Sequence, residues 1–258
     1  MVEWHDTAKN AVSPYPNTFL AASAIGGFMF ELNTKDFLKG DKNILDIFRT
    51  LKFKKDFKKE HSDYFEPEGL LVFCGVQGSG KTLSAVNYIS QLSYEYPKCI
   101  ICTNTDLSSI NPESKVIEYE GIKSLTDIEN GEFGVLYFID EIQLEFNSLE
   151  SKSIGIEVFV EIAQQRKQRK HIVGTSQVYG RLAKPFREQI RWVVACKKLF
   201  GCIQYNVLID GSTATEKDGQ LFYESSKPYI WFHSPKLYKG YDTYAKMKRY
   251  RKEWKNGY

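Results

Sequence analysis

Eight consecutive residues carry the strongest chemical signal in this sequence, the run Gly75-Val-Gln-Gly-Ser-Gly-Lys-Thr82. Its spacing matches G-x-x-x-x-G-K-[ST], the pattern of a phosphate-binding loop (P-loop). The glycines allow backbone N–H groups to turn toward one point, where they bind phosphate oxygens together with the partial positive charge of a helix N-terminus. The residues expected to bind a nucleotide are Gly75, Gln77, Gly78, Ser79, Gly80, Lys81 and Thr82.

Two residues of this loop have separate expected roles. Lys81 is expected to reach the β- and γ-phosphates, and the Thr82 hydroxyl to ligate Mg²⁺. The loop follows the apolar run Leu70–Cys74 and opens a helical segment, Lys81–Tyr94, which is the strand–loop–helix context that the motif requires. ATP and Mg²⁺ are therefore the expected substrate and cofactor.

A second apolar run, Val135–Ile139, ends in two acids, Asp140 and Glu141. Carboxylates make poor core residues, but at the carboxyl end of a parallel strand they face the ligand crevice. Asp140 is expected to hold Mg²⁺ through water, and Glu141 to orient and deprotonate the attacking water. The pair predicts hydrolysis of ATP rather than transfer of phosphate to a second small substrate.

A third strand, Ile172-Val-Gly-Thr-Ser-Gln177, also ends in polar residues. In hydrolytic P-loop proteins a strand of this kind lies between the P-loop strand and the strand that carries the acids. We expect Gln177 to face the γ-phosphate as a sensor. The alternative is a polar loop residue with no such role.

The segment before this strand, Gln164–Lys170, is strongly basic. Cations at a helix C-terminus complement the helix dipole, and this ordinary role covers most of them. Arg166 and Arg169 are our candidates for an arginine finger that reaches a neighbouring subunit's nucleotide, or for contacts with DNA phosphates. The sequence does not choose between these two and the arginines that follow, Arg181, Arg187 and Arg191.

Short apolar strands alternate with helices from Leu70 to Lys198, which predicts a three-layer α/β fold of the P-loop NTPase (ASCE, RecA-like) class with a mainly parallel sheet. The remaining expected elements are strands over Lys98–Thr103 and Arg191–Cys196, a helix over Ile156–Arg169, a C-terminal β-hairpin between Gln204–Ile209 and Gln220–Tyr223, and a strand over Pro228–His233. We divide the chain into an N-terminal helical extension (1–67), the P-loop core (68–200), a β-rich part (201–235) and a basic aromatic tail (236–258).

Composition limits the function classes. The 258 residues are 42% hydrophobic and 26% charged, as in globular proteins, and the net charge of +3 predicts no particular partner. No stretch reaches the roughly 18 consecutive apolar residues of a spanning helix. The longest, Phe19–Phe30, predicts a buried helix or, alternatively, an interfacial segment. Five cysteines without a secretory pattern ahead of them predict buried reduced thiols and a cytoplasmic location.

Two basic segments leave their partner open. The tail from Lys236 to Tyr258 carries eight Lys and Arg residues with tyrosines and a tryptophan among them, which suits phosphate contacts and base stacking. A solvated end is the ordinary alternative. The stretch Asp46–Glu60 alternates Phe and Leu with Lys and predicts either a surface helix or a contact with an anionic membrane.

These residues together resemble the FtsK/HerA superfamily of P-loop ATPases and, within it, the zonular occludens toxin-like (Zot-like) proteins of filamentous phages. The resemblance spans about residues 68–244. It is carried by GVQGSGKT at 75–82, TN at 103–104, FIDEIQ at 138–143, AQQRKQRKHIVGTSQ at 163–177, LAKPFREQIRWVV at 182–194 and YKGYDTY at 238–244. The P-loop is generic, whereas the basic helix that leads into a strand ending in T-x-Q is more specific.

The resemblance implies an ATP-hydrolysing motor that moves phage or mobile-element DNA during packaging or extrusion. It implies a homo-oligomeric ring with nucleotide at the subunit interfaces, on the cytoplasmic side of a host cell, with a membrane or virion-vertex partner left open. Zot-like proteins usually carry a transmembrane helix and a periplasmic part after the ATPase domain. The sequence departs from this pattern, because it shows neither and has about 65 residues before the P-loop strand.

Two other function classes remain for comparison. One is a nucleotide-gated assembly scaffold with slow hydrolysis, against which Glu141 argues. The other is a small-molecule kinase, which needs an arginine-rich lid that residues 204–233 do not resemble.

Overall fold

The computed structural model describes residues 44–66, 69–128, 132–149, 154–217 and 220–239. The chain divides into two compact units, residues 1–62 and 63–258. The described helix of the first unit is α3, Ile44–Glu60, which covers the predicted basic stretch. Helices long and apolar enough to cross a membrane are absent from the described residues. The predictions on Phe19–Phe30 and on the tail beyond residue 239 lie outside these residues, and the four-part domain division stays a prediction.

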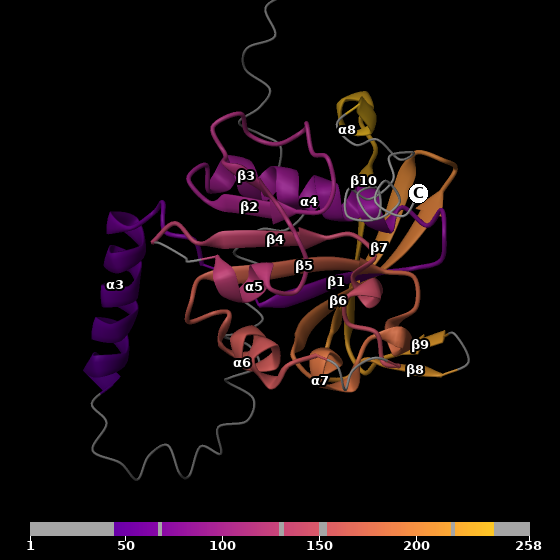
Figure 1. Cartoon of the computed structure of the whole chain (residues 1–258). Helices are drawn as coiled ribbons and strands as arrows, with labels where there is room; N and C mark the ends of the chain where they lie inside the picture. Colours follow the sequence, from indigo (N-terminus) through magenta and orange to yellow (C-terminus); the bar gives the residue numbers. More distant parts are fainter. Residues whose placement is uncertain (1–43, 67–68, 129–131, 150–153, 218–219, 240–258) are drawn as a thin grey trace, which may run out of the picture. The chain divides into compact units, whose positions relative to one another are not determined.

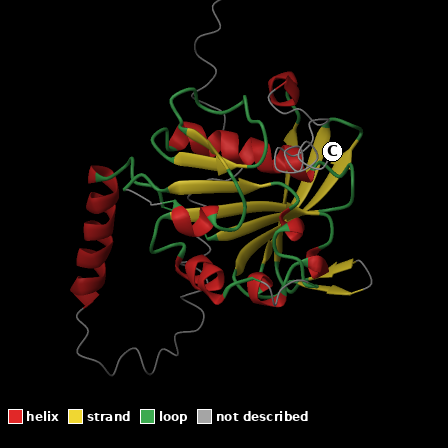
Figure 2. Cartoon of the chain, in the orientation of Figure 1, coloured by secondary structure: helices red, strands yellow, loops and turns green. Residues whose placement is uncertain are grey.

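A sheet of eight described strands forms the centre of the second unit (Figures 1 and 2). Its order is β10-β7-β6-β1-β5-β4-β2-β3. The bounds are β1 Leu70–Cys74, β2 Ile100–Thr103, β3 Val116–Glu118, β4 Val135–Ile139, β5 Lys170–Ser176, β6 Ile190–Leu199, β7 Ile203–Asp210 and β10 Ser226–Phe232. The strands from β6 to β3 pair in parallel, and β7 and β10 are antiparallel, which confirms the mainly parallel sheet.

Helices cover both faces of this sheet. The described ones are α4 Lys81–Glu95, α5 Ser124–Asp127, α6 Ile156–Gln164, α7 Lys184–Arg187 and α8 Pro235–Lys239, with short 3₁₀ turns η1 Ile142–Leu144 and η3 Tyr179–Arg181. The β1–α4–β2 and β4–α6–β5 crossovers run in opposite directions along the sheet. Because such crossovers are right-handed, α4 and α6 lie on opposite faces, as Figure 1 shows.

The central strands are buried on both sides, which is why they read as unbroken apolar runs. All five residues of β1 are buried. Leu70 and Val72 belong to the core that includes Val158 and Ile162 of α6. Phe73 alternates with these residues along the strand and so faces the other side of the sheet, where its ring centroid lies 6.2 Å from that of Tyr88 on α4.

The predicted hairpin between Gln204–Ile209 and Gln220–Tyr223 is wrong. Phe200 and Gly201 take positive φ values of 48° and 76°, so β6 turns directly into β7, which pairs with β6 and β10. The second segment pairs instead with β8, Thr215–Lys217, as strand β9, Gln220–Phe222, in a separate two-stranded sheet. The sequence reading ended β6 at Cys196 and so missed the tight turn.

The cysteine prediction is confirmed for Cys74, Cys99, Cys102 and Cys196, which are buried free thiols, whereas Cys202 in the β6–β7 turn is exposed. Burial raises the pKa of Cys99 and Cys102 to about 12, so both stay protonated thiols. Groups of acidic, histidine and cysteine side chains suited to a metal ion are absent from the described residues.

His171, buried at the start of β5, makes the stability of the protein sensitive to acid. Its Nε2 lies 3.0 Å from the Tyr88 hydroxyl and its Nδ1 contacts the Gly69 carbonyl. Burial lowers its pKa from 6.5 to about 4, although the Gly69 hydrogen bond opposes this shift. Between pH 6.5 and about pH 4, this histidine binds a proton in the unfolded chain but not in the folded protein. The free energy of unfolding therefore falls as the pH drops through this range.

We expect this histidine to account for roughly 3 kcal/mol of lost unfolding free energy between pH 7 and pH 4. Denaturant unfolding at both pH values measures the loss, with His171→Gln as the non-titrating control. The variant should lose less stability over the same interval. Equal losses in the two proteins would contradict the assignment.

Candidate functional site

The P-loop, residues 75–80, connects the carboxyl end of β1 to the N-terminus of α4. Gly78 and Gly80 have φ values of 79° and 84°, a left-handed backbone that favours glycine. A Cβ at Gly80 would collide with the amide of Gln204, whereas one at Gly78 would meet open space. The glycines thus allow one tight approach of the loop to β7 and leave its other side open.

The open side of the loop fits an anionic ligand. Gln77 and Gly78 are exposed there, and Lys81 is only 6% exposed at the start of α4. The buried Ser79 hydroxyl has no hydrogen-bond partner among the described residues. A glycine-rich loop, a buried lysine and a helix N-terminus that meet in this way are suited to bind phosphate.

Glu141 lies beside Lys81, as the sequence predicts for one site. The Lys81 Nζ is 3.2 Å from Glu141 Oε1, and Gln177 Nε2 donates to the same oxygen at 3.2 Å. Gln143 Nε2 donates to the other carboxylate oxygen. Glu141 has a left-handed backbone (φ 54°), an unfavourable conformation for a residue with a side chain. The structure therefore fixes both the backbone and the carboxylate of this residue.

Asp140 is buried next to the P-loop helix. Its Oδ1 accepts hydrogen bonds from Thr82 Oγ1 at 3.0 Å and from Thr175 Oγ1 at 2.6 Å. Burial raises the pKa of this carboxyl; the Thr175 hydrogen bond opposes the shift, and the Glu141 charge adds to it. A desolvated carboxylate beside the Thr82 hydroxyl suits a hard divalent cation, so Thr82 and Asp140 fit the expected Mg²⁺.

Three polar residues that sequence reasoning gave no role complete the site. Thr175 bonds Asp140 and also accepts the Glu141 backbone N–H at 2.9 Å. Asn104, at the end of β2, accepts the Asp140 N–H at 2.9 Å and donates to the Asp140 carbonyl at 3.1 Å. Gln143 is the third. The sequence signal for Asn104 and Thr175 was their place at the ends of β2 and β5. Neighbouring parallel strands bring their carboxyl ends together, so polar residues at these ends are expected at the site.

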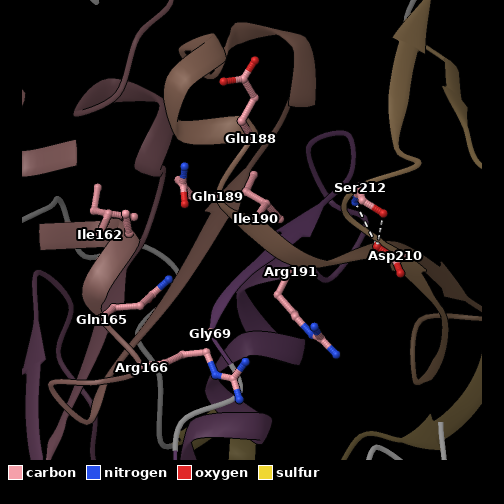
Figure 3. Close-up of a pocket in the computed structure, with 11 residues that line it drawn as sticks. Gly69, Ile162, Gln165, Arg166, Glu188, Gln189, Ile190, Arg191, Asp210 and Ser212 are labelled. Atoms are coloured by element: carbon pink, nitrogen blue, oxygen red, sulfur yellow. Dashed lines mark hydrogen bonds between the residues drawn. The ribbon is translucent and has the colours of Figure 1, made fainter. Parts of the chain in front are cut away.

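The strand β5 lies between β1 and β4, which confirms its expected place. The basic segment before β5 lies at the amino ends of the parallel strands, at the opposite end from the P-loop. Arg166 packs near Gly69, at the amino end of β1, and lines a pocket of about 330 Å³ there with Arg191 and Asp210 (Figure 3). Five to seven strand residues, about 20 Å, separate that end from the P-loop. Arg166 thus lies outside the phosphate site of its own chain.

Arg169 has a structural role in the chain itself. Helix α6 ends at Gln164 rather than at Arg169, because the backbone N–H groups of Gln165, Lys167 and Arg169 bond to carbonyls three residues back rather than four. Arg169 itself adopts a left-handed backbone (φ 51°). Its guanidinium lies 4.5 Å from the ring centroid of Tyr64 and bonds the Phe65 carbonyl. A finger role in a neighbouring subunit stays a prediction for Arg166 and Arg169.

The strand order, the P-loop between β1 and α4 and the acids at the end of β4 define the P-loop NTPase fold. Around its phosphate loop the site brings together a lysine, a buried aspartate with two hydroxyl donors, and a glutamate held by two glutamines. These groups are suited to bind a nucleoside triphosphate with Mg²⁺ and to activate water.

Several solved structures are similar to this chain. The N-terminal domain of zonular occludens toxin from Neisseria meningitidis is 16% identical, with a TM-score of 0.48 over 67% of this chain and 98% of that one. The genome packaging NTPase B204 from Sulfolobus turreted icosahedral virus 2, in complex with ATP-γS, is 12% identical, with a TM-score of 0.44 over 66% and 98%. The ATPase domain of G40P is 10% identical, with a TM-score of 0.43 over 73% and 95%.

The first of these belongs to the family that the sequence motifs resemble. No protein-family model matches the sequence, and no curated protein matches it. Because the TM-scores lie below 0.5, the fold assignment rests on the strand order and site of this chain.

Proposed function

We propose that this protein is an ATPase motor that moves phage or mobile-element DNA during packaging, virion assembly or extrusion. The observation that carries the hydrolysis in this proposal is the position of Glu141, which contacts Lys81 of the P-loop helix and Gln177. A protein that only binds ATP needs the loop and a cation site. A carboxylate oriented by two glutamines beside them is what hydrolysis requires in addition.

In this mechanism the P-loop N–H groups and Lys81 bind the β- and γ-phosphates. Lys81 Nζ exchanges the Glu141 carboxylate for phosphate oxygens, which frees Glu141 to accept a proton from water. The water oxygen bonds to the γ-phosphorus, and the bond from that phosphorus to the β–γ bridging oxygen breaks, giving ADP and phosphate. Thr82 and Asp140 would hold Mg²⁺, which would supply positive charge against the phosphates.

Gln177 is the proposed sensor of this cycle. It bonds Glu141 directly, so a change of contact between Gln177 and the γ-phosphate would move the base.

The remaining parts of the proposal concern partners. We infer a homo-oligomeric ring on the cytoplasmic side of a host cell, with DNA as the moved substrate and a membrane or virion vertex as the assembly site. Support comes from the sequence resemblance and the basic segments. Arg166 is exposed at the sheet edge opposite the P-loop, so any finger role must be across a subunit boundary.

Steady-state ATP hydrolysis by the purified protein tests the proposal, measured with and without single- and double-stranded DNA and with Lys81→Ala as the blank. We expect DNA to raise the wild-type rate several-fold and the variant to show no hydrolysis. The preferred strand form would separate extrusion from duplex packaging. Tight ATP binding with negligible turnover under all these conditions would overturn the motor and favour a nucleotide-gated scaffold.

A further inference from the structure

Strand β7 places two amide side chains, Gln204 and Asn206, in the interior on the face that packs on α4. Both residues are 0% exposed. A buried amide is costly unless its hydrogen bonds are made. Asn206 donates to the Ser84 hydroxyl at 3.1 Å and to the Tyr229 hydroxyl at 2.9 Å, and it accepts from Gln204 Nε2. This network connects the antiparallel part of the sheet to the P-loop helix.

Gln204 contacts the P-loop backbone itself. Its Nε2 donates to the Ser79 carbonyl at 2.9 Å, and its Oε1 fills the space above Gly80. A carbonyl only accepts, so this bond identifies the amide nitrogen as the atom that contacts Ser79. In a trans peptide the C=O and N–H point in opposite directions. Holding the Ser79 carbonyl toward β7 therefore directs the Gly80 N–H to the open side of the loop, where a phosphate binds.

The other end of the same amide is also held. His233 Nε2 lies 3.2 Å from Gln204 Oε1, and His233 Nδ1 lies 2.5 Å from the Tyr238 hydroxyl on α8. Because Oε1 is an acceptor, Nε2 must carry the proton. Burial and the nearby Lys198 lower the pKa of His233. Gln204 is thus fixed from two sides.

We propose that Gln204 is a positioning residue of the nucleotide site, which holds the Ser79–Gly80 peptide in the phosphate-binding orientation. His233 and Tyr238 extend this support to α8, the helix that contains the first residues of the basic aromatic tail. The inference rests on the proposed role of the P-loop as an ATP site. It adds to the nucleotide site a residue from the antiparallel part of the sheet, 125 positions along the chain from Ser79.

Gln204→Met tests the proposal, because methionine keeps the length and burial of the side chain but removes both ends of the amide. Asn206→Leu is the matched control: it is on the same strand and face and equally buried, and it removes a hydrogen bond to Gln204 but leaves the bond from Gln204 to the loop backbone in place. Two readouts are needed. One is the Kd for Mg²⁺–ADP, and the other is hydrogen exchange of the 75–82 amides in the protein without nucleotide.

We expect both variants to lower the melting temperature. Only Gln204→Met should raise the Kd about tenfold, or about 1.4 kcal/mol, and speed exchange in the loop. If both variants change the Kd and the exchange equally, or Gln204→Met changes neither, Gln204 has only a structural role and the proposal fails. If exchange responds only to Gln204→Met but the wild type does not bind ADP, the positioning stands and the proposed function fails.

Discussion

Replacing Glu141 by Gln should lower the rate of ATP hydrolysis by about 10³-fold while leaving ATP bound at least as tightly as in the wild type. Glutamine keeps the size of the side chain but cannot take the proton from water. It also removes the 3.2 Å ion pair with Lys81, so the lysine no longer has to leave a carboxylate when phosphates bind. The protein should therefore accumulate in the ATP-bound form.

Single-turnover hydrolysis and an ATP-binding titration measure the two effects separately. Glu188→Gln is the matched control, because it removes a carboxylate from an exposed i,i+4 pair with Lys184, beside the pocket at the amino end of the strands. That variant should hydrolyse ATP at the wild-type rate. If Glu141→Gln keeps more than about a tenth of the wild-type rate, another group activates the water and the assigned base is wrong.

The part of this site that could be predicted from the sequence is the part encoded locally. The P-loop has fixed spacing between a strand and a helix, and Asp140 and Glu141 directly follow a run of five buried apolar residues. The predicted bounds of β1 and β4 agree with the structure, because central strands of a parallel sheet read as unbroken apolar runs. Such signals need no knowledge of which strands pair.

The residues that sequence reasoning missed depend on pairing between distant segments. Thr175 meets Asp140 only because β5 lies next to β4, with Ile139 opposite Gly174. Gln204 reaches Ser79 only because β6 turns directly into β7. Phe200 and Gly201, both with positive φ, form this tight turn, whereas the sequence predicted a longer connection. Neither contact has a spacing pattern, since the partners are 35 and 125 residues apart.

Thr175→Val should lower ATP hydrolysis by about 10- to 100-fold, as expected for the loss of a group that orients a metal ligand. Valine matches the shape of threonine but removes its hydroxyl, which donates to Asp140 Oδ1 at 2.6 Å and accepts the Glu141 N–H at 2.9 Å. The residue is 0% exposed, so both groups would lose a partner that water does not replace. We expect unfolding free energy to fall by about 2 kcal/mol as well.

Thr175→Ser separates the two consequences, because serine restores the hydroxyl and removes only the buried methyl group. It should recover most of the hydrolysis while remaining less stable than the wild type, by about 1 kcal/mol. Kinetic assays and denaturant unfolding on the three proteins give the comparison. If hydrolysis instead follows stability, so that serine and valine variants are slowed in proportion to their destabilisation, the hydroxyl has no separate role in orienting the acids. If hydrolysis follows the presence of the hydroxyl, Thr175 orients both acids. Its single side chain then holds the proposed cation ligand Asp140 by the carboxylate and the proposed base Glu141 by the backbone N–H.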